Sequence, residues 1–451
     1  MRNFLVAIIS IGCTASIARA ELPPMPTNLQ VSAAKTAAIN YMSGRTQLVV
    51  DDDPAATAAN KNHLKVLAQW LAYRLLEAPY NGEPGGNASG PTQDMNTLMA
   101  DVDRYCRIIA LSQDGKSYYN DAHAQYALYL GEALKTEIEL VLKEATRPIE
   151  SINAVRMLSL ACVKMPATGV ADLLIKIIND KDASLANQLY AFDGVANLLS
   201  HSDFTEPTKH YLFNGEKLGE MATALHNFVV MPRQFKNTEE VQVLAYVRRN
   251  AVRALGTFKD SVIRNNRKEI IARPAWTLMH FLATSPQLMP APTPHERFEA
   301  AIGLASMTID QTLNVELSAY WVYTNVVFLA RVANDDSNRA AKSGAPVSLP
   351  WKIYAARLNT ALQIWQQSAK KLPAARNPDS ITRPAKDVTA NILEALEKSG
   401  AGANVNATGI TAVLQASPYA ATAGLMFSDL PSSTVPFPQV APKTAPPAKK
   451  P

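Results

Sequence analysis

Cysteine is scarce in this sequence. The 451 residues include three cysteines, and no two of them have the Cys-x-x-Cys spacing of a zinc ribbon or a c-type haem site. In an oxidising compartment Cys106 and Cys162 can form a disulfide. Both lie in helical patterns, so we favour two separate buried thiols that pack as small hydrophobic side chains. We expect no metal site and no cofactor.

Long apolar runs are also missing beyond the first twenty residues, as is a strong excess of one charge. The nearest candidate for a bilayer span, Tyr320–Val332, is too short and contains Thr324 and Asn325. The formal net charge is +5, but the two ends of the sequence contribute most of it, so the body is near neutral. We therefore expect no transmembrane helix and no nucleic-acid partner.

What the sequence does contain is helical periodicity. The composition, 47% hydrophobic and 18% charged, is sufficient for a folded core. Apolar residues recur at helical spacing along most of the chain, so we predict an all-α protein. The predicted helices cover Val31–Met42, Ala58–Ala78, Asp94–Ser112, Asp121–Ala145, Gly169–Asn179, Lys217–Phe228, Ile270–Ala283, Thr312–Ala333, Leu349–Leu372, Ala385–Lys398 and Ala407–Gln415.

The first twenty residues have the pattern of a secretory signal peptide. A positive start, Met1–Asn3, precedes the apolar run Phe4–Ile11, and Ala18–Ala20 is a small-x-small cleavage site before Glu21. We therefore predict an exported protein, located in the periplasm, in the cell envelope or outside the cell. Two alternatives remain open: a first buried helix, and a lipoprotein modified at Cys13.

A helix with a known family resemblance follows in the middle of the chain. In Val247–Gly256, the residues Val247, Ala251, Val252 and Leu255 share one face. Gly256 stands where a helix end favours a residue that tolerates positive φ. The decapeptide resembles the second helix of a HEAT repeat, whose usual run is Val-Arg-x-x-Ala-Ala-x-Ala-Leu-Gly.

Related segments recur at Asn153–Leu158, Asp193–Leu198, Asn250–Leu255 and Glu299–Leu304. They begin 40, 57 and 49 residues apart, against about 40–47 residues in HEAT units, so two of the gaps require insertions. The resemblance implies an α-solenoid of helical hairpins, and a closed α/α toroid is the alternative, since helical hairpins build both.

These patterns divide the chain into five parts. We assign residues 1–20 to the signal peptide, 21–150 to an N-terminal helical region, 151–310 to the HEAT-like repeats and 311–430 to a C-terminal helical region. Residues 431–451 form a tail in which seven of 21 residues are proline and three are lysine. This composition predicts an extended, disordered tail that contacts an anionic surface.

The HEAT resemblance also implies a binding surface. Second helices of that family commonly line the concave side, and their arginine often belongs to a polar ladder between units. Arg248 and Arg297 match the ladder position, whereas Ser151 occupies it in the first unit. Arg249 and Arg253 are therefore the better candidates for partner contacts within the set Arg248, Arg249, Arg253 and Arg297.

Catalytic motifs are weak. His295–Glu299 begins like a zinc-protease helix but has glutamate where the second histidine must stand, and Thr293 with Glu296 fits a helix capping box instead. The polar cluster that includes His201, His210 and Tyr211 suits proton abstraction in a helical polysaccharide lyase.

We predict an exported helical-repeat scaffold that binds a protein or a cell-envelope polymer without catalysis. A polysaccharide-active lyase or hydrolase on an α/α scaffold is the alternative.

Overall fold

The protein is all-α across the part described by the computed structural model. This part comprises residues 23–50, 52–77, 80, 91–113, 116–201, 213–231, 233, 237–282, 288–308, 310, 322, 339, 342–344, 351–369 and 390. The signal segment, the tail, His210, Tyr211 and most of the region 311–430 lie outside it. Among the described residues, none of the helices combines the length and apolar content needed to cross a membrane.

Helices make up nearly all of the regular structure. The α-helices are α1 (Asn28–Met42), α2 (Pro54–Tyr73), α3 (Pro91–Tyr105), α4 (Asp121–Glu144), α5 (Pro148–Ala161), α6 (Ala171–Asn179), α7 (Leu185–Ser200), α8 (Gly215–Val230), α9 (Thr238–Leu255), α10 (Pro274–Leu282), α11 (Pro294–Ser306) and α13 (Trp351–Ala369). Two 3-10 helices, η1 (Arg74–Leu76) and η2 (Thr168–Val170), adjoin α2 and α6. Two antiparallel hairpins pair β1 (Leu111–Gln113) with β2 (Lys116–Tyr118) and β3 (Ile263–Arg264) with β4 (Ile270–Ala272).

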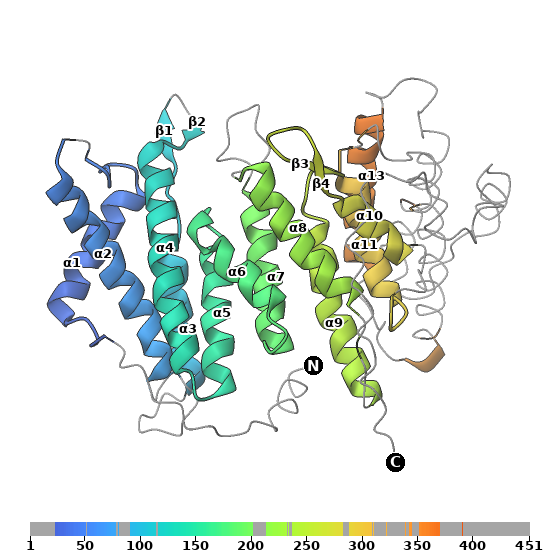
Figure 1. Cartoon of the computed structure of the whole chain (residues 1–451), viewed down its shortest axis with the longest axis horizontal. Coiled ribbons are helices and arrows are strands. Elements are labelled where there is room, and N and C mark those ends of the chain that lie inside the picture. Colours follow the sequence, from blue (N-terminus) through green and yellow to red (C-terminus); the bar gives the residue numbers. More distant parts are fainter. Residues whose placement is uncertain are drawn as a thin grey trace, which may run out of the picture.

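The helices pack as a series of pairs. From α5 onward, the odd-numbered helices contact one another in order: α5 packs on α7, α7 on α9, α9 on α11 and α11 on α13. The intervening helices α6, α8 and α10 lie against α7, α9 and α11, and α8 also contacts α6 and α10. The order in space follows the order in the chain, from α1 and α2 at one end to α10, α11 and α13 at the other (Figure 1).

One continuous hydrophobic core runs through this series, from Val31 in α1 to Trp365 in α13. The apolar face predicted for α9 is confirmed, since Val252 and Leu255 have no exposed surface. In α13, Leu358 lies on the predicted face and is buried as well. The 3.6-residue period therefore identified the buried side of these helices correctly.

Helix ends follow from local capping residues. α4 begins where the Asn120 side chain accepts a hydrogen bond from the His123 backbone, and its bounds differ from the prediction by one residue. The capping box predicted for α11 is also confirmed, because Thr293 and Glu296 exchange the two expected hydrogen bonds. These starts were predictable because the groups involved are three residues apart.

Gly256 corrects one prediction. Its φ of −69° is ordinary right-handed helix, so the expectation that this position requires a positive φ is wrong. The glycine is needed for close packing: a Cβ there would lie 2.8 Å from the Cα of Gly303 in α11. A Cβ on Gly303 would in turn lie 2.6 Å from the Cα of Gly256. The pair lets α9 and α11 touch backbone to backbone.

Two predicted helices are too long. The segment predicted as Ile270–Ala283 begins with β4 at Ile270–Ala272, and α10 starts only at Pro274. The segment predicted as Asp94–Ser112 ends as α3 at Tyr105, after which the chain forms β1. In each case the first or last turn pairs with a neighbouring strand, and such pairing overrides helical periodicity.

The two cysteines of the described chain, Cys106 and Cys162, are free thiols, as the sequence analysis favoured. Both are fully buried near the ends of α3 and α5, where an isolated bridge joins Arg107 to Lys164. Burial, with a smaller contribution from Asp103, raises the pKa of Cys106 to about 12. The Cys106 side chain therefore stays a neutral thiol that packs as an apolar group.

Candidate functional site

The four arginines predicted to contact a partner occupy very different environments. Arg248 is 1% exposed and forms a bidentate ion pair with Glu296 of α11, with Nε–Oε1 and Nη2–Oε2 distances of 2.5 and 3.2 Å. The pair holds α9 against α11. Because the guanidinium is buried and paired, we leave Arg248 out of the candidate surface.

Arg297 also faces inward. It is partly buried, and its Nη2 donates to the backbone oxygen of Leu282 at 3.3 Å. Burial lowers the pKa of its guanidinium. Its described contact is thus with the end of α10, which fits a structural role better than a partner contact.

Arg249 and Arg253 are the accessible pair. Arg249 is half-buried and stacks with its guanidinium carbon 4.9 Å from the ring centroid of Tyr246, whereas Arg253 is exposed. Tyr246 itself is 50% exposed. The three residues follow one another at i, i+3 and i+7, so they form one stripe on α9. We call this stripe, Tyr246, Arg249 and Arg253, the arginine surface.

Side chains from three other helices border the arginine surface. Burial raises the pKa of Asp193 in α7, and the charge of Arg253 opposes that shift. Burial first, and the charge of Arg249 second, lower the pKa of His295 in α11. Burial raises the pKa of Tyr354 in α13, against the charge of Arg249. Together with the packing of α7 and α11 on α9 and of α13 on α11, these effects indicate that the three helices border the stripe.

A second ion pair lies at the border with α13. Arg357 donates from both terminal nitrogens to Glu299 of α11, at 2.9 and 2.7 Å. Its hydrogen bonds to Glu299 raise the pKa of Arg357. Glu299 is therefore neutralised by Arg357 and does not serve as the counter-ion of Arg249 or Arg253.

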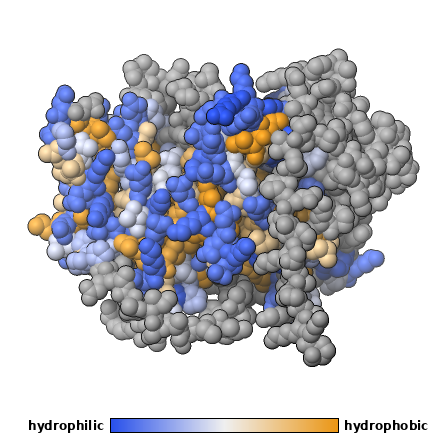
Figure 2. All heavy atoms as spheres, in the orientation of Figure 1, coloured by the Kyte–Doolittle hydropathy of each residue, from blue (hydrophilic) through white to orange (hydrophobic). Residues whose placement is uncertain are grey.

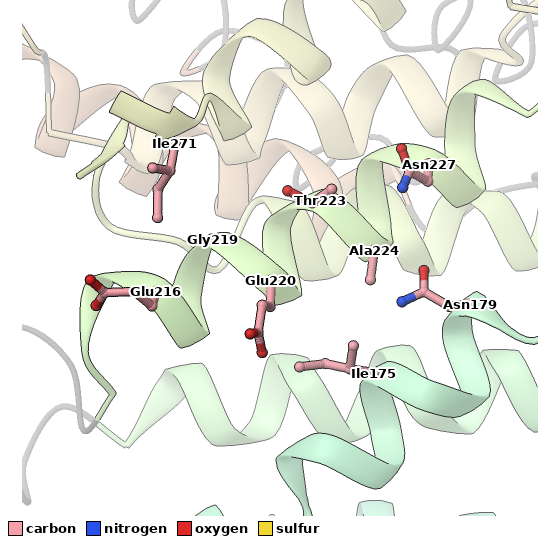
Figure 3. Close-up of a pocket in the computed structure, with 9 residues that line it drawn as sticks. All are labelled: Ile175, Asn179, Glu216, Gly219, Glu220, Thr223, Ala224, Asn227 and Ile271. Carbon is pink, nitrogen blue, oxygen red and sulfur yellow. The ribbon is translucent and has the colours of Figure 1, made fainter. Parts of the chain in front are cut away.

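The structure also contains a groove that the sequence analysis missed. It has a volume of about 390 Å³ and lies between α6, α8 and β4 (Figure 3). Its lining residues are Ile175, Asn179, Glu216, Gly219, Glu220, Thr223, Ala224, Asn227 and Ile271. The face shown in Figure 2 is mainly hydrophilic, with a hydrophobic patch near β3 and β4, and Ile271 of β4 is 37% exposed.

The groove has a polar wall but little acid–base potential. Glu220 is ion-paired with Lys217, which also binds Asp172 at 2.7 Å. Glu216 accepts a hydrogen bond from the Asn266 backbone at 3.3 Å. No histidine, tyrosine or lysine is among the lining residues. The groove is therefore better suited to binding than to proton transfer.

The histidines of the described chain are mostly structural. His201, proposed for the lyase alternative, lies within hydrogen-bonding distance of the Cys162 backbone oxygen, with Nε2 at 2.7 Å. Burial lowers the pKa of His226 to about 4 and that of His280 to about 3, and His226 contacts Thr277 at 2.9 Å. Among the described residues, no group of three or more metal-binding side chains is arranged to hold a metal ion.

Comparison of the chain with protein-family models, with curated proteins and with solved structures finds no match.

Proposed function

We propose that this protein is an exported helical-repeat scaffold of the HEAT-like α-solenoid type. It binds a protein or a cell-envelope polymer through the arginine surface and makes or breaks no bond. Export rests on the signal pattern in residues 1–20, and the basic tail, 431–451, provides a second contact with an anionic surface.

Helix packing supports the repeat interpretation. The four related segments of the sequence fall in α5, α7, α9 and α11, and these helices contact one another in succession. The helices that precede them in the chain are α4, α6, α8 and α10, so each unit consists of two helices. In a solenoid each unit buries its apolar face against its neighbours, which is the arrangement that this alternation favours.

The Arg248–Glu296 pair supports the same interpretation. Arg248 stands at the ladder position of the HEAT-like segment, and its partner belongs to the next unit, 48 residues further along the chain. We take this buried pair as fixing how α9 and α11 are aligned rather than as adding net stability. The pair is thus consistent with the ladder role that the resemblance implies.

The arginine surface is the observation that carries the binding proposal. Arginine is over-represented at interface hot spots, and its planar fork binds carboxylates in a bidentate manner. Within the described residues, no carboxylate lies within ion-pair distance of Arg249 or Arg253. Apart from the influence of Arg253 on Asp193, their charge is thus available to a partner.

The test compares capture by tagged protein with and without the two arginines. We expect Arg249→Ala with Arg253→Ala to retain the thermal midpoint but to capture much less of the envelope partner from a membrane extract. The matched control is Lys181→Ala with Arg267→Ala, which removes the same charge from exposed positions elsewhere. Equal capture by both double variants would remove the arginine surface from the proposal.

The enzymatic alternative has its own test. A lyase would cleave a uronic-acid polysaccharide through the cluster of His201, His210 and Tyr211. Turnover of such a polymer by the intact chain, abolished by His210→Ala, would overturn the scaffold proposal.

A further inference from the structure

We propose that the arginine surface recognises an acidic peptide segment of the partner, with Arg249 and Arg253 each binding one carboxylate. The inference rests on the proposed scaffold function and adds the chemistry of the segment that is bound. Four observations support it: the spacing of the arginines, their lack of carboxylate partners, the stacking of Arg249 and the aromatic residues nearby.

The spacing matches two carboxylates of one peptide. Residues at i and i+4 of a helix have Cβ atoms about 5–6 Å apart. In an extended peptide, side chains at i and i+2 lie on the same side and about 6.5–7 Å apart. The long arginine side chains accommodate the small difference. A segment of the type Glu-x-Glu can therefore place one carboxylate on Arg249 and the next on Arg253.

Several arginines of the described chain are held in ion pairs within the fold. Arg74 is paired with Asp101 at 2.9 Å, Arg264 with Asp310 at 3.2 Å, and Arg357 with Glu299 at 2.7 Å. Arg249 and Arg253 have no such pair in the described chain, although two like charges one turn apart repel each other by a few tenths of a kcal/mol. A bound dicarboxylate relieves that repulsion.

Stacking prepares Arg249 for binding. Its guanidinium lies 4.9 Å from the ring centroid of Tyr246, one turn earlier in α9. This contact restricts the side chain before a ligand arrives, so less rotamer entropy is lost on binding. The edge of the guanidinium keeps its N–H groups for a carboxylate.

The surroundings favour a peptide over a sugar chain. Tyr246 is the exposed aromatic residue of the stripe, and Arg249 already lies over its ring. Tyr354, the other nearby ring, is only 8% exposed and packs on Phe298, with the ring centroids 4.9 Å apart. Arg249 covers one face of the Tyr246 ring, and Tyr354 is buried against Phe298, so the surface has no wide, open aromatic platform for a sugar chain.

The experiment uses the full chain and two labelled peptides. One alternates glutamate with serine, and the other has glutamine in place of each glutamate. We expect the glutamate peptide to bind, the glutamine peptide to bind at least tenfold more weakly, and high salt to reduce the affinity. Arg249→Ala with Arg253→Ala should weaken binding of the glutamate peptide at least tenfold. The affinity of the Arg249→Lys, Arg253→Lys variant should lie between those of the wild type and the double-alanine variant. Lysine keeps the charge but lacks the planar, forked guanidinium.

The outcomes separate the inference from the proposed function. Equal binding of both peptides, or an unchanged affinity in the double-alanine variant, overturns the acidic-peptide inference. If an oligogalacturonate binds and the glutamate peptide does not, the inference is also overturned, and the surface is assigned to an anionic polysaccharide. If neither probe binds but the double-alanine variant still loses capture from the envelope extract, the scaffold function stands and only the ligand chemistry is wrong. The control Lys181→Ala with Arg267→Ala must behave as wild type.

Discussion

Removing one partner of the buried ion pair should destabilise the protein strongly. Arg248 and Glu296 have side chains that are 2% and 0% exposed, so neither charge can turn to water when the other is lost. Two unit charges about 4 Å apart interact by about 4 kcal/mol at an effective dielectric constant near 20. We therefore expect Arg248→Met to lower the free energy of unfolding by about 3–5 kcal/mol.

A double-mutant cycle isolates the ion pair. Glu296→Gln keeps a residue type that fits the capping box but leaves Arg248 unpaired, so it should also cost about 3–5 kcal/mol. The double variant carries no buried charge at either position. Its loss should be well below the sum of the two single losses, since buried pairs replaced together are often nearly neutral.

The assay is urea unfolding followed by far-ultraviolet circular dichroism, with linear extrapolation to water. Lys164→Met is the matched control, because it breaks a 2.7 Å pair with Asp103 whose side chains are 48% and 39% exposed. This surface pair should be worth about 0–1 kcal/mol. The ion pair does not hold the two helices together if Arg248→Met costs no more than Lys164→Met. The same conclusion follows if the losses from Arg248→Met and Glu296→Gln simply add in the double variant.

Three further predictions concern the same core. Gly256→Ala should destabilise the protein by about 1–3 kcal/mol by overpacking against Gly303, and an unchanged thermal midpoint would refute the contact. Leu255→Ala should cost about 2–5 kcal/mol in the same measurement, as core truncations do. The pKa of His226 falls from 6.5 to about 4 on folding, so the unfolded chain binds the proton more tightly. Stability should therefore decline as the pH falls from about 6.5 to about 4, by on the order of 3 kcal/mol, and His226→Gln should reduce this slope in unfolding titrations at pH 7 and 4.5.

Local patterns predicted much of the fold. The extent of α4, the Thr293–Glu296 capping box and the buried face of α9 depend on residues a few positions apart. The β4 strand was missed because its three residues also fit a helical apolar pattern, although its partner β3 lies only a few residues earlier in the same hairpin. Gly256 was misinterpreted for a different reason: its close neighbour, Gly303, is 47 positions away in the printed sequence.

In the candidate site, too, features set by nearby residues were predictable and features set by distant residues were not. Sequence spacing placed Arg249 and Arg253 off the apolar face of α9, and in the structure Arg249 is half-buried and Arg253 is exposed. The HEAT resemblance assigned Arg248 to the ladder position instead, but only the fold shows that its partner is Glu296. The groove along α8 combines residues from α6, α8 and β4, and no local motif marks it.

The two glutamates of α11 have a mechanical consequence. Glu296 binds Arg248 of α9, and Glu299 binds Arg357 of α13, so α11 is fastened on both sides. Sliding it by one helical turn, about 5.4 Å, requires both ion pairs to break together. The α5–α7 contact carries neutral amide hydrogen bonds instead, such as that from Asn197 to the Ser159 backbone at 3.2 Å. Under a pulling force the helices α9, α11 and α13 should therefore move as one stiff block.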